Sequence, residues 1–214
     1  MSDLVPARTA SAITSDAVNP TSGFQADYPG KLRVRILPAC TRLIIRGREP
    51  ARAAAGHALG LALPVTPCRA LGDGDRAVLW LGPDEWLLLA ARSERDAGMA
   101  RLRQAFEPEG KKSIAHALVD VSDRQISYEV SGPLAGDVLN VGCPLDLDSQ
   151  AFGAGMCTRT LMGKAEIVLW RGSLPERGDG IEPNAFRIEV QRSYAAYVCQ
   201  LLATAASALC AITA

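Results

Sequence analysis

Short stretches in which apolar and polar residues alternate recur along this chain, and this pattern predicts β-strands with one covered face. In one of these stretches, Ile126, Tyr128 and Val130 alternate with Ser127 and Glu129. Alternating or more continuously apolar runs predict strands at Leu32–Leu37, Arg42–Arg46, Arg76–Leu81, Glu85–Ala90, Ala117–Val121, Ile126–Val130, Ala165–Trp170 and Phe186–Val190.

Helical patterns separate these strands. Pro50 and Pro133 each fit the first turn of a helix, because proline lacks an N–H that would have no partner there. Gly60 and Gly142 follow the two helices, at the place where a residue with positive φ commonly ends a helix.

A longer helix follows each later pair of strands. Ser93 is expected to cap the first of them, with Asp96 in a weaker form of the capping box. Its inner stripe consists of Met99, Leu102 and Phe106. The inner stripe of the last helix consists of Tyr194, Tyr197, Val198, Leu201, Leu202 and Leu209.

The chain also resembles itself over a long period, which is the signature of a repeated structural unit. Residues 32–47 can be laid over residues 117–132 without a gap, and Val34 then matches Val119. The match resumes further on, where CRALGDGDRAVLWLG pairs with CTRTLMGKAEIVLWRG with one single-residue gap.

The order strand–strand–helix–strand–strand–helix, found twice, predicts an α+β fold. We expect two duplicated ββαββα units with antiparallel sheets and packed helices, at residues 31–110 and 111–214, together forming one domain. The sequence leaves open whether the units share a continuous sheet system or form two lobes. Residues 1–30 are expected to form a flexible or partner-bound tail.

Two insertions lengthen the second unit, at Leu147–Gly155 and at residues 172–184. Long loops inside compact domains are more often functional than decorative. We expect residues 173–184 to contact a partner.

Composition narrows the class of function. Hydrophobic residues make up 48% of the chain and charged residues 21%, which is typical of a globular protein. Lys+Arg and Asp+Glu both number 23, so the chain has no charge excess for binding nucleic acid or anionic lipid. We find no signal peptide and no membrane-spanning run of roughly 20 apolar residues.

The six cysteines have scattered spacings with no CxxC, so reduced thiols in the cytoplasm are expected. The two histidines, His57 and His116, have no cysteine or carboxylate neighbours at metal-ligand spacing, and no metal site is expected. Gly163-Lys164 lacks the remainder of a P-loop.

Other candidate groups have structural explanations. The acid pairs Asp84/Glu85 and Asp146/Asp148 are most simply solvated, and residues 72–75 form a turn. Core positions are expected for the three tryptophans, Trp80, Trp86 and Trp170. The residues alone therefore indicate no catalytic set.

A family resemblance adds to this picture. Val119–Asp148 resembles the opening of the folate-binding fold of the glycine-cleavage aminomethyltransferase family. A closer similarity, to the gamma subunits of heterotetrameric sarcosine oxidases, covers most of residues 76–202. It rests on the segments LGPDEWLLLA, VDVSDRQ, EVSGPLA, GCPLDLD, CTRTLMGKAEIVLWR and FRIEVQRSYAAYV.

The resemblance implies a folate-binding-like domain that serves as a non-catalytic structural and assembly subunit. The complex would oxidatively demethylate sarcosine to glycine, yielding hydrogen peroxide and 5,10-methylenetetrahydrofolate. Its alpha and beta subunits would hold FAD, FMN, NAD and tetrahydrofolate, and its delta subunit zinc. The chain itself would hold no cofactor, no metal and no catalytic residue.

Aminomethyltransferases carry an acidic pair where this chain has Ala165 and Glu166. Glu166 is therefore the single candidate for folate binding, and Asp120 or Arg124 could position a pterin. One alternative is an independent tetrahydrofolate-dependent aminomethyl or formyl transferase. The other is a gamma-type subunit of a related N-methyl amino acid oxidase or dehydrogenase.

Overall fold

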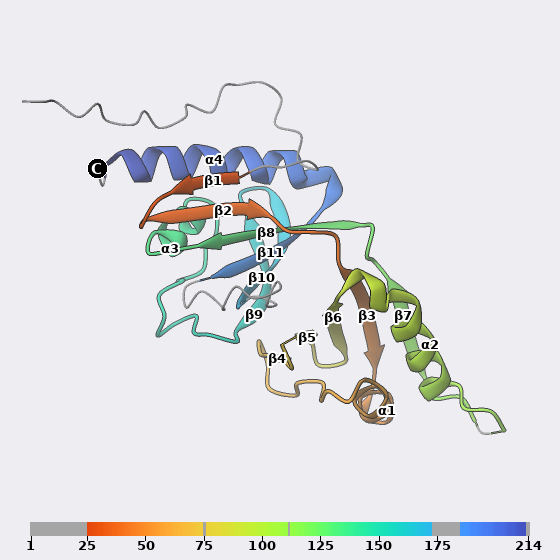
Figure 1. The fold of residues 1–214 in the computed structure, drawn as a ribbon. Coiled ribbons are helices and arrows are strands. Elements are labelled where there is room, and N and C mark those ends of the chain that lie inside the picture. The colour runs from red at the N-terminus through yellow and green to blue at the C-terminus, as the bar shows by residue number, and fades with distance from the viewer. Residues whose placement is uncertain (1–24, 75, 111, 173–184, 213–214) are drawn as a thin grey trace, which may run out of the picture.

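The computed structural model describes residues 25–74, 76–110, 112–172 and 185–212, which form two antiparallel sheets (Figure 1). Sheet A has the order β1 (Gln25–Tyr28), β2 (Leu32–Ile36), β8 (Gln125–Ser131), β11 (Phe186–Gln191), β10 (Ala165–Arg171), β9 (Cys157–Met162). Sheet B has the order β4 (Ala70–Gly72), β5 (Ala77–Gly82), β6 (Glu85–Ala90), β3 (Thr41–Gly47), β7 (His116–Asp120).

Helices cover the outer face of each sheet (Figure 1). Sheet A packs against α3 (Ala135–Asn140) and α4 (Ala195–Ile212), and sheet B packs against α1 (Glu49–Leu59) and α2 (Arg95–Phe106). A third apolar cluster lies between the inner faces of the two sheets. The prediction of antiparallel sheets with packed helices is confirmed.

Each predicted unit, residues 31–110 and 111–214, has one more strand than the predicted ββαββα order. The residues before the turns at Gly72 and Gly163 form strands β4 and β9, which pair with β5 and β10 as hairpins. These segments are short or lie at a sheet edge, and their weak apolar pattern hid them.

Strands from the two halves of the chain pair with each other, so the halves do not form two separate lobes. β2 pairs with β8 in sheet A, and β7 pairs with β3 in sheet B. Sheet A thus contains β1 and β2 from the first half of the chain, and sheet B contains β7 from the second half, so the two sheets form one interlocked body.

The gapless overlay of residues 32–47 on 117–132 is wrong by one residue in its first strand. Val34 opposes Val130, whereas Val119 opposes Ile44, one position from the equivalent Ile45. A slip of one residue turns a side chain to the other face of a sheet. Val34 is accordingly fully buried and Val119 is 48% exposed.

The ends of the helices follow the sequence in part. Gly60 ends α1 with φ 64°, as expected, and Pro50 lies in its first turn. Gly142 does not have positive φ; a Cβ there would lie 2.9 Å from Leu201 Cδ2, so close packing explains the glycine. Ser93 caps no helix, because a 3₁₀ turn, Arg92–Glu94, leads directly into α2.

Two predictions about the chain ends need correction. Residues 25–28 belong to strand β1 rather than to a tail, because they pair with β2. Residues 1–24 lie outside the described part, as does the predicted contact loop at 173–184.

Tyr194 and Tyr197 are 44% and 40% exposed instead of lying in the inner stripe of the last helix.

Contrary to the sequence prediction, one helical stretch, Arg192–Ile212, is long and apolar enough to cross a membrane. Its buried residues pack on sheet A, including Val198, Leu202 and Ala206. This packing accounts for its apolar character as that of a core helix.

Candidate functional site

The inner face of sheet A is polar along β8 and β11, although sheet B covers it. Ile126, Tyr128 and Val130 of β8 face α4, so Ser127 and Glu129 between them point towards sheet B. The same alternation on β11 turns Arg187, Glu189 and Gln191 to this side. The zone between the sheets is called the seam below.

A charged cluster lies at the centre of the seam, formed by Arg42 from sheet B and by Arg187, Glu189 and Ser127 from sheet A. Glu189 Oε2 accepts a hydrogen bond from Arg42 Nε at 2.6 Å, and its Oε1 accepts one from Arg187 Nε at 2.6 Å. The Ser127 hydroxyl donates to Glu189 Oε1 at 2.8 Å. All four residues are at most 3% exposed.

Further donors of the two arginines also have hydrogen-bond partners. Arg42 Nη1 donates to the carbonyl oxygens of Ser122 at 3.2 Å and Cys40 at 3.3 Å, and its Nη2 donates to Ser127 Oγ. Arg187 Nη2 donates to Ser127 Oγ and Cys40 Sγ, both at 3.1 Å. Two guanidinium groups and one carboxylate therefore share a site without solvent.

The ionisation of the cluster follows from these contacts. Burial alone would raise the pKa of Glu189, but Arg187 and Arg42 stabilise its charged form and lower the pKa below the ordinary value. Burial would lower the pKa of Arg187, but Glu189 raises it. Burial also raises the pKa of the Cys40 thiol, which keeps this sulfur protonated.

A cleft of about 240 Å³ lies at one end of the seam. Its sheet A wall includes the polar residues Gln125 and Gln191, which oppose each other on β8 and β11, and Glu166 on β10. The sheet B wall is mostly apolar, with Ile44, Leu81, Leu87 and Val119 and the adjoining Val121, and its charged residue is Glu85.

An ion pair between the sheets borders the cleft. Arg159 of β9 reaches Glu85 of β6, with Nη1 3.3 Å from Glu85 Oε2 and also 3.3 Å from the carbonyl oxygen of Leu81. The Gln125 amide oxygen is buried and has no hydrogen-bond partner among the residues that the structure describes.

The structure brings together two of the three residues for which the sequence suggested a folate role. Glu166 and Arg124 both line the cleft, and both are exposed. Asp120 instead forms an ion pair with Arg95, and its Oδ1 accepts the Ser122 N–H at 2.9 Å. Its pKa is lowered, because these bonds outweigh the opposing effect of burial.

The side chain of Ala165 faces away from this cleft. It is fully buried among the core residues between sheet A and α4. An acid at this position would enter that apolar core, so the cleft side of the strand offers Glu166 alone.

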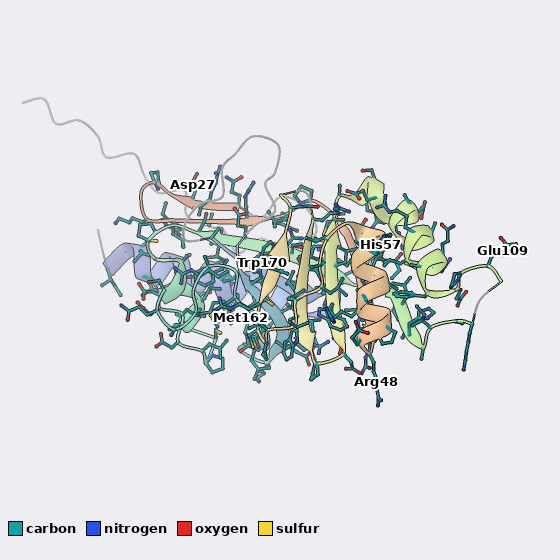
Figure 2. All side chains as sticks on the ribbon, turned by 90° about the horizontal axis from the view of Figure 1, so that it is seen from below. Asp27, Arg48, His57, Glu109, Met162 and Trp170 are labelled. Carbon is teal, nitrogen blue, oxygen red and sulfur yellow. The ribbon has the colours of Figure 1, made fainter. Side chains whose placement is uncertain are left out.

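The other chemically interesting residues lie apart. His57 is exposed on α1, on the sheet B side of the molecule (Figure 2). His116 stacks on Phe106 with ring centroids 4.3 Å apart. Asp146 and Asp148 accept backbone N–H groups in a turn. In the ranges given above, no three His, Cys, Asp or Glu residues could hold a metal ion.

The tryptophans have the core positions that were expected. Trp86 and Trp170 are 2% and 8% exposed, and Trp80 packs against the sheet B core. Trp86 Nε1 donates to the Pro64 carbonyl oxygen at 2.7 Å. Trp170 lies in the seam (Figure 2).

Sequence comparison places this chain among known proteins. The model of the sarcosine oxidase, gamma subunit family matches residues 46–208. The chain belongs to this family. A sarcosine oxidase subunit gamma from Arthrobacter sp is 32% identical over 150 residues, covering 69% of this chain and 70% of the relative. One from Corynebacterium sp. (strain U-96) is 35% identical over 120 residues, covering 56% and 55%.

A solved structure extends the family likeness to the fold. A chain of the heterotetrameric sarcosine oxidase from Corynebacterium sp. U-96, in complex with pyrrole 2-carboxylate, superimposes with a TM-score of 0.72. The two chains are 28% identical, and the match covers 86% of this chain and 87% of that one. The matched chain of that complex thus has a fold similar to the two-sheet body described above.

Sequence reasoning missed the charged cluster in the seam. The alternation in FRIEV was visible, with Arg187 and Glu189 between apolar residues, but antiparallel sheets commonly expose such a face to water. Arg42 inside a predicted strand was the second available signal. Only the packing of sheet B over this face shows that the charges are buried.

Proposed function

We propose that this chain is the gamma subunit of a heterotetrameric sarcosine oxidase complex and that it acts there as a structural subunit. The match with a chain of that complex over 86% of the sequence carries this proposal. The complex is an oxidoreductase, and this chain contributes to it without a catalytic residue of its own.

The seam supports a structural role. Its centre is filled by a buried charged cluster in which both carboxylate oxygens of Glu189 accept hydrogen bonds from Arg42, Arg187 and Ser127. The sulfur of the buried Cys40 accepts a hydrogen bond from Arg187 Nη2 at 3.1 Å. Such a cluster fixes how one sheet sits on the other.

Co-purification tests the role in assembly. The chain is co-expressed with the alpha, beta and delta subunits, and the mixture is separated by size-exclusion chromatography. We expect the chain to elute in the same peak as the other three. Elution of the chain alone, beside an active complex of the other three subunits, would refute the proposal.

Partners and cofactors follow from the family. We propose that the alpha, beta and delta subunits hold FAD, FMN, NAD, tetrahydrofolate and zinc, that this chain holds no cofactor or metal, and that the complex works in the cytoplasm. Metal and flavin analysis of the separated subunits tests the distribution. Flavin remaining with this chain after separation would contradict it.

The substrate of the complex is the second point to test. We propose sarcosine, which is converted to glycine with formation of hydrogen peroxide and 5,10-methylenetetrahydrofolate. Oxygen consumption with a panel of N-methyl amino acids decides the matter. Faster turnover of N-methylglutamate than of sarcosine would assign the chain to a related N-methyl amino acid oxidase or dehydrogenase instead.

The cleft is the feature that favours one alternative function, an independent tetrahydrofolate-dependent aminomethyl or formyl transferase. It contains Glu166 beside Arg124, with an apolar wall opposite. Glu166 fits a folate amine poorly, because Ala165 beside it faces the core. The other two acids that line the cleft are already paired, Glu85 with Arg159 and Glu189 with Arg42 and Arg187. We therefore propose that this chain has an aminomethyltransferase-like fold without the transferase activity. We also propose that this fold arose by duplication of one unit.

Calorimetric titration of the full chain with tetrahydrofolate separates the two functions. The structural role predicts no measurable heat. Micromolar affinity that is lost in Glu166→Gln and kept in the exposed control Glu49→Gln would favour the transferase.

The loop at 173–184 remains our proposed contact with a partner subunit. Deleting it should weaken co-purification with the other subunits. Unchanged co-elution of the deletion variant would refute this assignment.

A further inference from the structure

Cys68 and Cys157 lie opposite each other where the two sheets are joined by a short backbone bridge. Arg69 and Met156 form an isolated antiparallel bridge. The Cys157 N–H donates to the Cys68 carbonyl oxygen at 2.9 Å, and the Ala70 N–H donates to the Gly155 carbonyl oxygen at 2.8 Å. This pattern makes Cys68 and Cys157 directly opposed residues.

The opposition follows from the internal repeat. Cys68 and Cys157 begin the two segments that match each other in the overlay, and each precedes or opens a hairpin strand. Cys68 leads into β4 of sheet B, and Cys157 is the first residue of β9 of sheet A. A covalent bond between them would therefore tie sheet A to sheet B.

The backbone spacing suits such a bond. Residues joined by such a bond in a regular antiparallel pair have Cα atoms about 5.5 Å apart, and disulfides span Cα separations of roughly 4.4–6.8 Å. Cys68 leaves the regular strand conformation, with φ 59°, but its carbonyl oxygen keeps the 2.9 Å hydrogen bond from the Cys157 N–H. We propose that Cys68 and Cys157 form a reversible disulfide when the protein meets peroxide, and that this bond locks the two sheets together.

The two thiols differ in a way that orders the reaction. Cys68 is partly exposed and is the one described non-glycine residue with positive φ, at 59°. Cys157 is fully buried, and its Sγ lies 3.5 Å from the Trp80 carbonyl oxygen. Burial raises the pKa of the Cys157 thiol to about 12, and the nearby Cys68 adds to this rise.

Cys68 is therefore the sulfur that peroxide reaches first. Its thiolate attacks one peroxide oxygen, which breaks the O–O bond and yields a sulfenic acid and, after protonation, one water. The Cys157 sulfur then attacks the Cys68 sulfur and loses its proton, and the hydroxyl of the sulfenic acid leaves as a second water. In sum, two thiols and one hydrogen peroxide give one disulfide and two waters.

The other four cysteines lie beside different groups. Cys40 contacts Arg187, Cys143 lies 3.9 Å from Thr160 Oγ1, and Tyr128 and Lys31 act on the ionisation of Cys199 and Cys210. The disulfide is therefore assigned to Cys68 and Cys157 alone.

Peptide mapping tests the proposal on the full-length chain. The protein is treated with increasing hydrogen peroxide, the remaining thiols are alkylated, and the sample is digested with trypsin and Asp-N. Trypsin releases Cys68 in residues 53–69, and Asp-N separates Cys143 from Cys157 by cutting at Asp146 and Asp148. Mass spectrometry before and after dithiothreitol then identifies the linked peptides.

We expect a dithiothreitol-sensitive link between Cys68 and Cys157 in the wild type and in the control Cys210→Ala, and none in Cys68→Ser. The denaturant midpoint should rise on oxidation of the wild type and stay unchanged in Cys68→Ser. If Cys68 instead reaches the sulfinic or sulfonic state without a link, stays a thiol, or pairs with another cysteine, the proposal is wrong. Wild-type mapping decides this even if the serine variant fails to fold.

Discussion

Removing the charge of Glu189 is the most informative perturbation of the seam. The substitution Glu189→Gln keeps the size of the side chain but leaves Arg42 and Arg187 buried without a counter-charge. Both arginines bond the carboxylate at 2.6 Å, and Glu189 is 1% exposed. Solvent therefore has no access to replace the lost interaction.

The expected loss of stability is large. Breaking a buried ion pair by removing one partner typically costs about 3–5 kcal/mol, because the remaining charge stays buried and unpaired. The amide can keep the hydrogen bond from Ser127 through its oxygen, but its NH₂ group meets donors. We expect Glu189→Gln to lower the free energy of unfolding by about 3 kcal/mol or more.

Urea unfolding of the full-length chain, followed by tryptophan fluorescence, measures this loss. The exposed Glu49→Gln serves as control and should change the free energy by less than about 0.5 kcal/mol. The triple variant Arg42→Met, Arg187→Met, Glu189→Met should regain most of the loss, since apolar replacement of a buried cluster is often neutral. A cost below about 1 kcal/mol for Glu189→Gln would refute the reasoning.

The same carboxylate predicts a pH dependence. The pKa of Glu189 is lower in the folded chain than its ordinary value of 4.5. Its contribution is therefore fully present above about pH 4.5 and is lost as the pH falls through the lower folded pKa. The stability difference between wild type and Glu189→Gln should be constant from pH 6 to 8 and shrink below pH 4.5, which unfolding curves at several pH values would measure.

Two further substitutions test the packing of α4 on sheet A. Gly142→Ala should cost about 1–3 kcal/mol in urea unfolding, because its Cβ would lie 2.9 Å from Leu201 Cδ2 and 3.0 Å from the Gly163 N; an unchanged midpoint would contradict this contact. Tyr128→Phe should cost about 1 kcal/mol, because the hydroxyl donates to the Ala195 carbonyl oxygen at 3.0 Å; a gain in stability would mean that this bond contributes nothing.

The strands were predictable because their alternation is local. All eight predicted strands are present within two residues of their expected bounds, and Leu102 and Phe106 are fully buried on the inner stripe of α2. Strand β1 was missed because its four residues carry no apolar period and form a strand only by pairing with β2.

The seam was not predictable because it depends on contacts between distant segments. Arg42 and Glu189 are 147 residues apart, and their pairing requires one sheet to cover the polar face of the other. A sequence pattern shows which residues share a face, but not whether that face meets water or a second sheet. The outward positions of Tyr194 and Tyr197 likewise depend on how α4 sits on sheet A.

The measurement that tests the structural role most directly is native mass spectrometry of the complex. The alpha, beta and delta subunits are expressed with and without this chain, and the mass and the sarcosine-dependent oxygen consumption of each product are determined. We expect one copy of each of the four chains when this chain is present, and loss of the assembled mass when it is omitted. A fully active complex of the other three subunits, with this chain absent from the observed mass, would contradict the account.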